Sequence, residues 1–204
     1  MSGTSRRRLG ILLSGRGSNF EAIAQNVLSG RLDCEIGFVF SNKPDAPGLA
    51  RARALGFQAG SIPSAGKDRA AFDSQVADLL HENGVDLVCL AGYMRLLSGK
   101  FVSQFAERIL NIHPSLLPAF PGLDAQYQAL VYGVKVTGCT VHLVDENLDS
   151  GPILLQAPVP VLDDDSLETL SQRILKEEHR IYSEAIGWML RGNYRIEGRR
   201  VIRT

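Results

Sequence analysis

The chain has 204 residues, of which 45% are hydrophobic, and its 22 lysines and arginines balance its 22 aspartates and glutamates. A chain of this length and apolar content can bury a full core, and its length favours a single domain. Zero net charge excludes a global basic field that would hold a nucleic acid or an anionic membrane, so the partners that we expect are small molecules.

The first half of the chain alternates short apolar strands with helical patterns. This rhythm predicts an α/β fold with an open, mostly parallel, Rossmann-like sheet and helices on both faces. Strands are expected at residues 9–13, 36–40, 58–62, 85–91 and 109–113. Helices are expected from residue 18, in a short segment that stops at residue 56, at 68–83 and at 98–106. Ser18 and Glu21 have the spacing of a capping box, so the first helix should begin directly after the glycines.

After Pro118, alternation of apolar and polar residues replaces the strand–helix rhythm. A short helix is expected at 126–132, and two β-rich runs, at 138–144 and 153–161, predict antiparallel strands. A long final helix should open at Asp165, with Glu168 three residues on, and should end near residue 191. The tail is compatible with a small hairpin between residues 194 and 203.

The glycine loop Gly15-Arg16-Gly17-Ser18-Asn19 lies between the first strand and the first helix. Free backbone N–H groups and the positive end of a helix dipole suit a phosphate there. The loop is not a P-loop, because G-K-[ST] is missing, and it is not a dinucleotide fingerprint, because Phe20 replaces the third glycine. Since Ser41-Asn42 rather than an acid ends the second strand, we interpret the loop as a monophosphate site. The alternative is a tight turn that only packs helix on strand.

Asn111 and His113 are two residues apart in an expected strand, so their side chains leave the same face. Pro114 and Pro118 stop regular pairing after His113, because proline cannot donate a ladder hydrogen bond. His113 therefore falls at a strand end, where open α/β sheets carry their catalytic groups. A core histidine next to a turn-forming asparagine is the alternative.

Asp149 is the acid that we would pair with His113, because a nearby carboxylate orients an imidazole for general acid/base chemistry. It lies in an acidic, turn-rich loop at residues 145–152, where Asp145 or Glu146 could serve instead. With Asn111 as a neutral donor, the trio could stabilise an oxyanion and move a proton without a metal or a covalent nucleophile. A loop that contains only turn residues is the alternative.

Other candidate residues carry weaker signals. Met94-Arg95-Leu96-Leu97 follows a buried strand and could line an apolar slot for a flat ring, or could be core. Glu178 falls within the apolar stripe of the last helix, so it must be paired, exposed or ligand-bound. We assign structural roles to the remaining histidines, His81, His142 and His179, because their sequence neighbours are not candidate catalytic residues.

The cysteines and the first residues of the chain indicate the cellular compartment of the protein. Cys34, Cys89 and Cys139 are odd in number and widely spaced, which favours buried thiols over disulfides or a zinc site, although Cys139 could be accessible. The longest apolar runs are far short of the roughly 20 residues of a membrane span, and the start lacks a signal-peptide core. We expect a cytoplasmic protein.

From about Leu9 to Arg191 the chain resembles the phosphoribosylglycinamide formyltransferase family, the folate-dependent glycinamide ribonucleotide transformylases of purine synthesis. The resemblance rests on five motifs in the order of that family: Ser14-Gly15-Arg16-Gly17-Ser18-Asn19, Phe40-Ser41-Asn42-Lys43, Leu90-Ala91-Gly92-Tyr93-Met94-Arg95, Asn111-Ile112-His113-Pro114-Ser115-Leu116-Leu117-Pro118 and Leu148-Asp149-Ser150-Gly151-Pro152-Ile153. The Asn-x-His-Pro motif is shared with methionyl-tRNA formyltransferase and formyltetrahydrofolate hydrolase, whereas the glycine loop discriminates between these families. The extra domains expected of the other two would not fit in 204 residues.

The resemblance implies a role for each motif. It makes Asn111, His113 and Asp149 the catalytic trio and Glu178 a contact of the glycinamide ribonucleotide. It implies that Gly15, Gly17, Ser18 and Asn19 hold the substrate phosphate. It also implies a folate site made of Arg69, Met94, Arg95, Leu96, Leu97, Val102, Asn111 and Asp145.

The reaction implied is formyl transfer from 10-formyltetrahydrofolate, a cosubstrate, to the amine of glycinamide ribonucleotide, without a metal, a nucleic acid or a membrane. A monomer or a homodimer is expected. The single domain would comprise a phosphate-binding half at about 9–110, a catalytic and folate-loop half at about 111–191 and a tail at 192–204. The alternatives are a formyltransferase for another amine, such as an amino sugar nucleotide, and a non-catalytic nucleotide-binding module.

Three positions depart from the pattern of the family. Asp124 and Gln126 stand where members often carry histidines, and Leu175 stands where some carry a glutamine that helps with substrate. These departures bear on how the substrate is held more than on the reaction.

Overall fold

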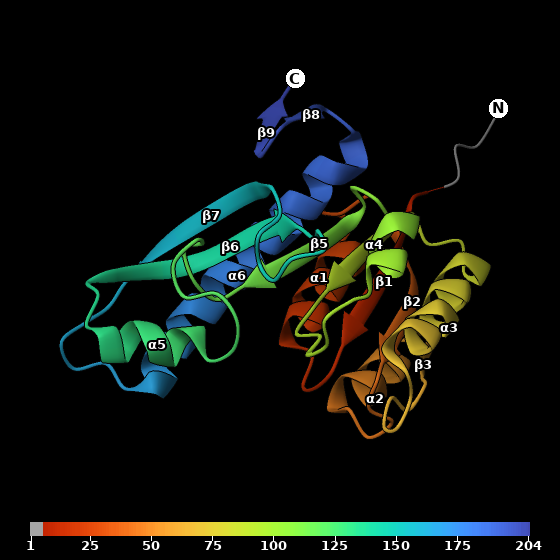
Figure 1. Cartoon of the computed structure of the whole chain (residues 1–204), viewed down its shortest axis with the longest axis horizontal. Helices are drawn as coiled ribbons and strands as arrows, with labels where there is room; N and C mark the ends of the chain where they lie inside the picture. The colour runs from red at the N-terminus through yellow and green to blue at the C-terminus, as the bar shows by residue number, and fades with distance from the viewer. Residues whose placement is uncertain (1–5) are drawn as a thin grey trace. The chain divides into compact units, whose positions relative to one another are not determined.

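The computed structural model describes residues 6–204, which fall into two compact units (Figure 1). The first unit ends at Leu110 and the second begins at Asn111. The boundary falls within strand β5 (Ile109–His113), whose last three residues belong to the second unit. No helix in the described range is both long and apolar enough to cross a membrane.

The first unit repeats a strand followed by a helix. Its elements are β1 (Arg8–Leu13), α1 (Ser18–Leu28), β2 (Glu35–Ser41), α2 (Pro47–Ala54), β3 (Ala59–Ser61), α3 (Arg69–Glu82), β4 (Leu87–Leu90) and α4 (Gly99–Gln104). Residues 9–13 of β1 are all buried, as expected for a central parallel strand covered on both faces. The strands and helices expected in this half are confirmed, with shifts of a few residues at their ends.

The strand order in the first unit is β3-β2-β1-β4, and each neighbouring pair is parallel. The chain moves outward from β1 to β3 and then returns to the other side of β1. Because parallel crossovers are right-handed, this reversal places α1 and α2 on one face, where they pack together, and α3 and α4 on the other. The carboxyl ends of β1 and β4 therefore flank the topological switch point, where open α/β sheets bind ligands.

The second unit is built around a long antiparallel pair. Its elements after β5 are α5 (Ala125–Tyr132), β6 (Val136–Leu143), β7 (Ile153–Pro160), α6 (Leu167–Arg191), β8 (Tyr194–Glu197) and β9 (Arg200–Arg203). Strands β6 and β7 are antiparallel, β9 runs parallel to β7, and β8 closes a hairpin with β9. The buried stripe of α6 packs on β6, β7 and α5.

The expected fold class is therefore confirmed: parallel strands with helices in the first unit, then antiparallel strands and a long final helix. Two helix starts differ from the expectation. Gly17, with φ 81°, is the N-cap of α1 and no side chain of the described residues caps it, so Ser18 is already helical and no capping box forms with Glu21. The last helix is capped by Ser166.

Asp165 does not cap α6 because its carboxylate has another partner. Both of its oxygens bind the Arg173 guanidinium, at 2.7 and 2.8 Å. This bidentate pair holds the pKa of Asp165 well below its usual range. The capping box is made by Ser166 and Thr169 instead.

Candidate active site

Asn111 and His113 lie on β5 with one residue between them, and His113 is only 4% exposed. His113 is held through both ring nitrogens. Its Nε2 is 2.8 Å from the carbonyl oxygen of Phe120, and its Nδ1 is 3.3 Å from Oδ2 of Asp149. A carbonyl oxygen only accepts, so Nε2 carries a proton. The expected pairing of His113 with Asp149 is therefore present, although its catalytic role stays a prediction.

Asp149 is fixed by the backbone as well as by His113. Its φ is 48°, in the left-handed region that non-glycine residues rarely adopt. The Oδ2 atom accepts a 2.8 Å hydrogen bond from the backbone N–H of Gly122, and the side chain is 9% exposed. Asp145, one of the alternatives for this role, instead accepts from the backbone N–H of Asn147 and the hydroxyl of Ser150.

His142, which the sequence argument placed among structural residues, belongs to this cluster. It is 2% exposed on β6, and its Nε2 is 3.1 Å from the Asn111 amide nitrogen and 3.7 Å from Oδ1 of Asp149. Its Nδ1 donates a 2.8 Å hydrogen bond to the carbonyl of Leu143. A signal for it exists in the sequence: His142 lies in the expected strand at 138–144, which leads directly into the acidic loop that carries Asp149.

The charge state of His142 follows from its burial. Loss of water lowers the pKa of His142, and this effect exceeds the opposing effects of the Leu143 carbonyl and Asp149. A neutral ring that donates from Nδ1 has a lone pair on Nε2, so it accepts a hydrogen bond from the Asn111 amide. His142 thereby fixes which end of the Asn111 amide is nitrogen and leaves its second N–H for another acceptor.

This arrangement combines two chemical functions and a cavity within one unit. Asn111 offers a neutral N–H donor of fixed orientation. His113 and Asp149 face each other through two atoms that would repel if neither held a proton, so the pair is suited to hold and transfer one. A cavity of about 520 Å³ adjoins Asp149 and is lined by Leu117, Pro118, Pro121, Leu148, Asp149, Ser150, Gly151, Ile153 and Arg199.

The glycine loop lies in the first unit, at the carboxyl end of β1. A Cβ at Gly17 would meet the Cα of Gly48 at 3.2 Å, and φ is 81°, so both space and backbone favour glycine there. The N-terminus of α1 directly follows this residue. Asn19, in the first turn of α1, is 8% exposed.

Ser14 links the ends of the strands at the switch point. Its hydroxyl donates to Oδ1 of Asn42 at 2.6 Å and accepts from the backbone N–H of Met94 at 2.8 Å, and its own N–H binds the Gly92 carbonyl at 3.0 Å. Because the three segments come from β1, β2 and β4, this hydroxyl ties the loops at that edge of the first unit.

The residues expected to hold a folate divide between the units. Met94 and Leu96 are 65% and 55% exposed, so these two side chains are not core. The guanidinium carbon of Arg95 lies 4.6 Å from the Phe72 ring centre. Arg69 is exposed at the start of α3, and the members in the first unit are Arg69, Met94, Arg95, Leu96, Leu97 and Val102. Asn111 and Asp145 belong to the second.

Two further expectations concern buried groups in the second unit. Glu178 is 7% exposed on α6, which excludes the possibility that it is merely a surface residue. Cys139 is fully buried, and burial raises the pKa of its thiol to about 12. The suggestion that Cys139 is accessible is therefore wrong, while the expectation of buried thiols is confirmed for all three cysteines.

The model of the formyl transferase family matches residues 7–186 of this chain. The chain belongs to the formyl transferase family. Among solved members, glycinamide ribonucleotide transformylase 1 from Symbiobacterium toebii superimposes with a TM-score of 0.95 at 54% identity, over 99% of this chain and 95% of that chain.

Curated relatives of the formyl transferase include phosphoribosylglycinamide formyltransferase from Bacillus subtilis, 41% identical over 94% of this chain and 98% of that protein. The trifunctional purine biosynthetic protein adenosine-3 of Bos taurus is 44% identical over 94% of this chain. The matched part is only 19% of the trifunctional protein, so the chain corresponds to one of its segments.

Proposed function

We propose that this formyl transferase moves the formyl group of 10-formyltetrahydrofolate to the amine of glycinamide ribonucleotide, a step of purine biosynthesis. The single observation that carries the proposal is the cluster of Asn111, His113 and Asp149, in a chain 54% identical over nearly its full length to a glycinamide ribonucleotide transformylase. The products are formylglycinamide ribonucleotide and tetrahydrofolate.

In the proposed reaction the glycinamide amine attacks the formyl carbon and a tetrahedral intermediate forms. The second N–H of Asn111 and the Nε2–H of His113 stabilise its oxyanion. In the structure, Nε2–H of His113 binds the Phe120 carbonyl at 2.8 Å. It releases this carbonyl in the reaction and binds the substrate oxygen instead. The bond between carbon and the folate N10 then breaks, and the proton lost by the amine reaches N10 with help from the His113–Asp149 pair.

Substrate binding is assigned by chemistry and by family membership. The glycine loop at residues 15–19, with Gly17 at the N-terminus of α1, suits the phosphate of the ribonucleotide. We assign Glu178 to the ribonucleotide, and Met94 to Leu97, Arg69, Val102 and Asp145 to the folate. The exposed Met94 and Leu96 side chains support that assignment, because apolar side chains free of the core are available to a flat ring.

The deciding experiment mixes the purified chain with 10-formyltetrahydrofolate and glycinamide ribonucleotide and follows the appearance of deformylated folate. We expect product that depends on both substrates. An amino sugar nucleotide is offered as a competing acceptor in a second arm. Faster transfer to that acceptor would overturn the proposed substrate, and binding of ribonucleotide without any transfer would indicate a non-catalytic module.

A further inference from the structure

The C-terminal hairpin, β8 with β9, follows the part of the chain that the family model matches, which ends at residue 186. The hairpin is nevertheless joined to the sheet of the second unit, because Arg200 of β9 pairs in parallel with Ile153, the first residue of β7. Ile153 follows directly after the connection between β6 and β7, residues 144–152, which contains the acidic loop. The hairpin is thus attached at the point where the loop that carries Asp149 ends.

A second contact joins the hairpin to the loop itself. Arg199 lies in the turn of the hairpin, and its guanidinium donates a hydrogen bond to the backbone carbonyl of Ser150, the residue after Asp149. Arg199 and Asp149 also line the same cavity of about 520 Å³. A cationic side chain from the end of the chain therefore reaches the peptide next to the proposed catalytic acid.

The loop has features that make such a contact useful. Asp149 has a φ of 48°, a left-handed conformation that is strained for a residue other than glycine, so the loop would move away from it if the contacts that hold it were lost. Within the loop, Asp145 binds the hydroxyl of Ser150 at 2.8 and 2.9 Å. Gly151 passes so close to the Leu143 carbonyl that any Cβ would clash with it. These contacts shape the loop, and Arg199 connects it to a separate element.

We propose that Arg199 is a positioning residue that holds the loop in the conformation in which Asp149 faces His113. This inference rests on the proposed function of the site. Arg199 acts through the Ser150 carbonyl and does not touch the reacting atoms. When that bond is lost, the loop spends more time away from His113, so turnover falls while binding at the glycine loop in the first unit is unaffected.

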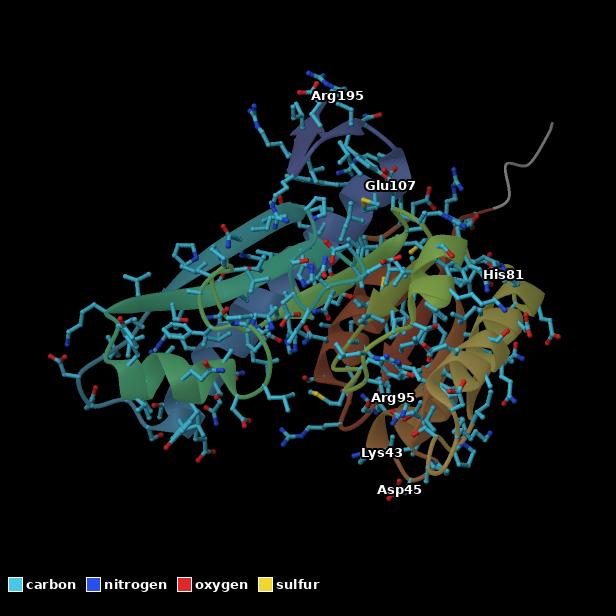
Figure 2. The ribbon with its side chains drawn as sticks, in the orientation of Figure 1. Lys43, Asp45, His81, Arg95, Glu107 and Arg195 are labelled. Carbon is cyan, nitrogen blue, oxygen red and sulfur yellow. The ribbon has the colours of Figure 1, made fainter. Side chains whose placement is uncertain are left out.

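The test compares three variants of the full-length protein. Arg199→Ala removes the donor, and Arg199→Lys keeps a cation that can still reach a carbonyl. Arg195→Ala is the matched control, because Arg195 lies on the same hairpin (Figure 2) but pairs with Glu197, at 2.6 Å. All three are tested by thermal unfolding, steady-state kinetics and amide hydrogen exchange.

For Arg199→Ala we expect a kcat about three- to tenfold lower, as for the loss of one hydrogen bond, with the KM for ribonucleotide unchanged. Amides at residues 144–152 should exchange faster. Arg199→Lys should recover part of both effects, and Arg195→Ala should match the wild type. A merely structural role would lower the melting temperature without this separation of kcat from KM.

Two results would overturn the inference: wild-type kcat in Arg199→Ala, or a lower kcat with loop exchange identical to that of the wild type. The exchange measurement needs no turnover, so it also separates this inference from the proposed function. If the wild-type protein transfers no formyl group, the proposed function fails, and the exchange rates alone decide whether Arg199 holds the loop.

Discussion

In the first unit, the glycine loop offers backbone N–H groups at the start of α1, and both the space and the positive φ at residue 17 favour glycine. In the second unit, the cluster around His113 consists of buried and partly buried side chains from β5, β6 and the loop after β6. The first region is continuous in sequence and exists once its helix forms. The second joins residues that are up to 38 positions apart, Asn111 and Asp149.

This difference indicates which function each region is suited to. Backbone groups of a loop and helix bind a phosphate with little dependence on side-chain protonation. Buried imidazole and carboxylate groups can move protons, because their charge states depend on burial and on one another. We therefore expect substitutions in the first region to change affinity, and substitutions in the second to change turnover.

The largest effect should come from His113→Ala. It removes the N–H that we assign to the oxyanion and the partner of Asp149, so kcat should fall on the order of 100-fold or more. His81→Ala is the control, because His81 is an exposed histidine of α3 (Figure 2) that binds Gln104 at 3.2 Å. Near-full turnover in a folded His113→Ala protein would reject the assignment.

A smaller effect, confined to affinity, is expected for Gly17→Ala. A side chain there meets positive φ and the backbone of Gly48, so the KM for ribonucleotide should rise about tenfold while the KM for folate is spared. Gly30→Ala is the matched control: its φ is 74° and its Cβ would meet nothing within 4 Å, so it adds the same backbone strain elsewhere. Equal damage to both KM values would contradict a phosphate site.

His142→Phe tests whether the second region depends on fixed orientation. Phenylalanine fills the space but cannot accept a hydrogen bond. The Asn111 amide therefore loses the hydrogen bond to Nε2 of His142, 3.1 Å away, that fixes its orientation. We expect a kcat lower by about three- to tenfold, with His142→Gln less affected because its amide oxygen can accept. If His142→Phe and His142→Gln have the same kcat, the hydrogen bond between residue 142 and the Asn111 amide does not contribute to turnover.

The sequence predicted the fold of the first unit well, because a short parallel strand and its helix are signalled by local periodicity. It also located the glycine loop and Asn111-x-His113, each of which is a continuous motif. His142 was missed because its contacts with Asn111 and Asp149 depend on the pairing of β6 with its neighbours, which periodicity does not reveal. The prediction that Asp165 opens the last helix was wrong for a similar reason, because the carboxylate of Asp165 binds Arg173, eight residues away.

The smallest expected effect is on stability, and it concerns His142 alone. The pKa of His142 is lowered in the folded protein by burial, from an ordinary value of 6.5. Below that pH the unfolded chain binds a proton at this residue more readily than the folded protein does, so folding stability declines as the pH falls. The charges of Asp149 and Asp145 raise the pKa of this ring and His113 lowers it, so the test needs a variant that keeps these neighbours and changes His142 alone.

His142→Gln is that variant, because it keeps a hydrogen-bonding side chain and removes only the titrating group. Between pH 7.5 and 5.5 the melting temperature of the wild type should fall by about 1–3 °C more than that of His142→Gln. The measurement is thermal unfolding by circular dichroism in matched buffers. The same pH dependence in both proteins would mean that His142 is not held neutral by burial, and that the orientation of the Asn111 amide has another cause.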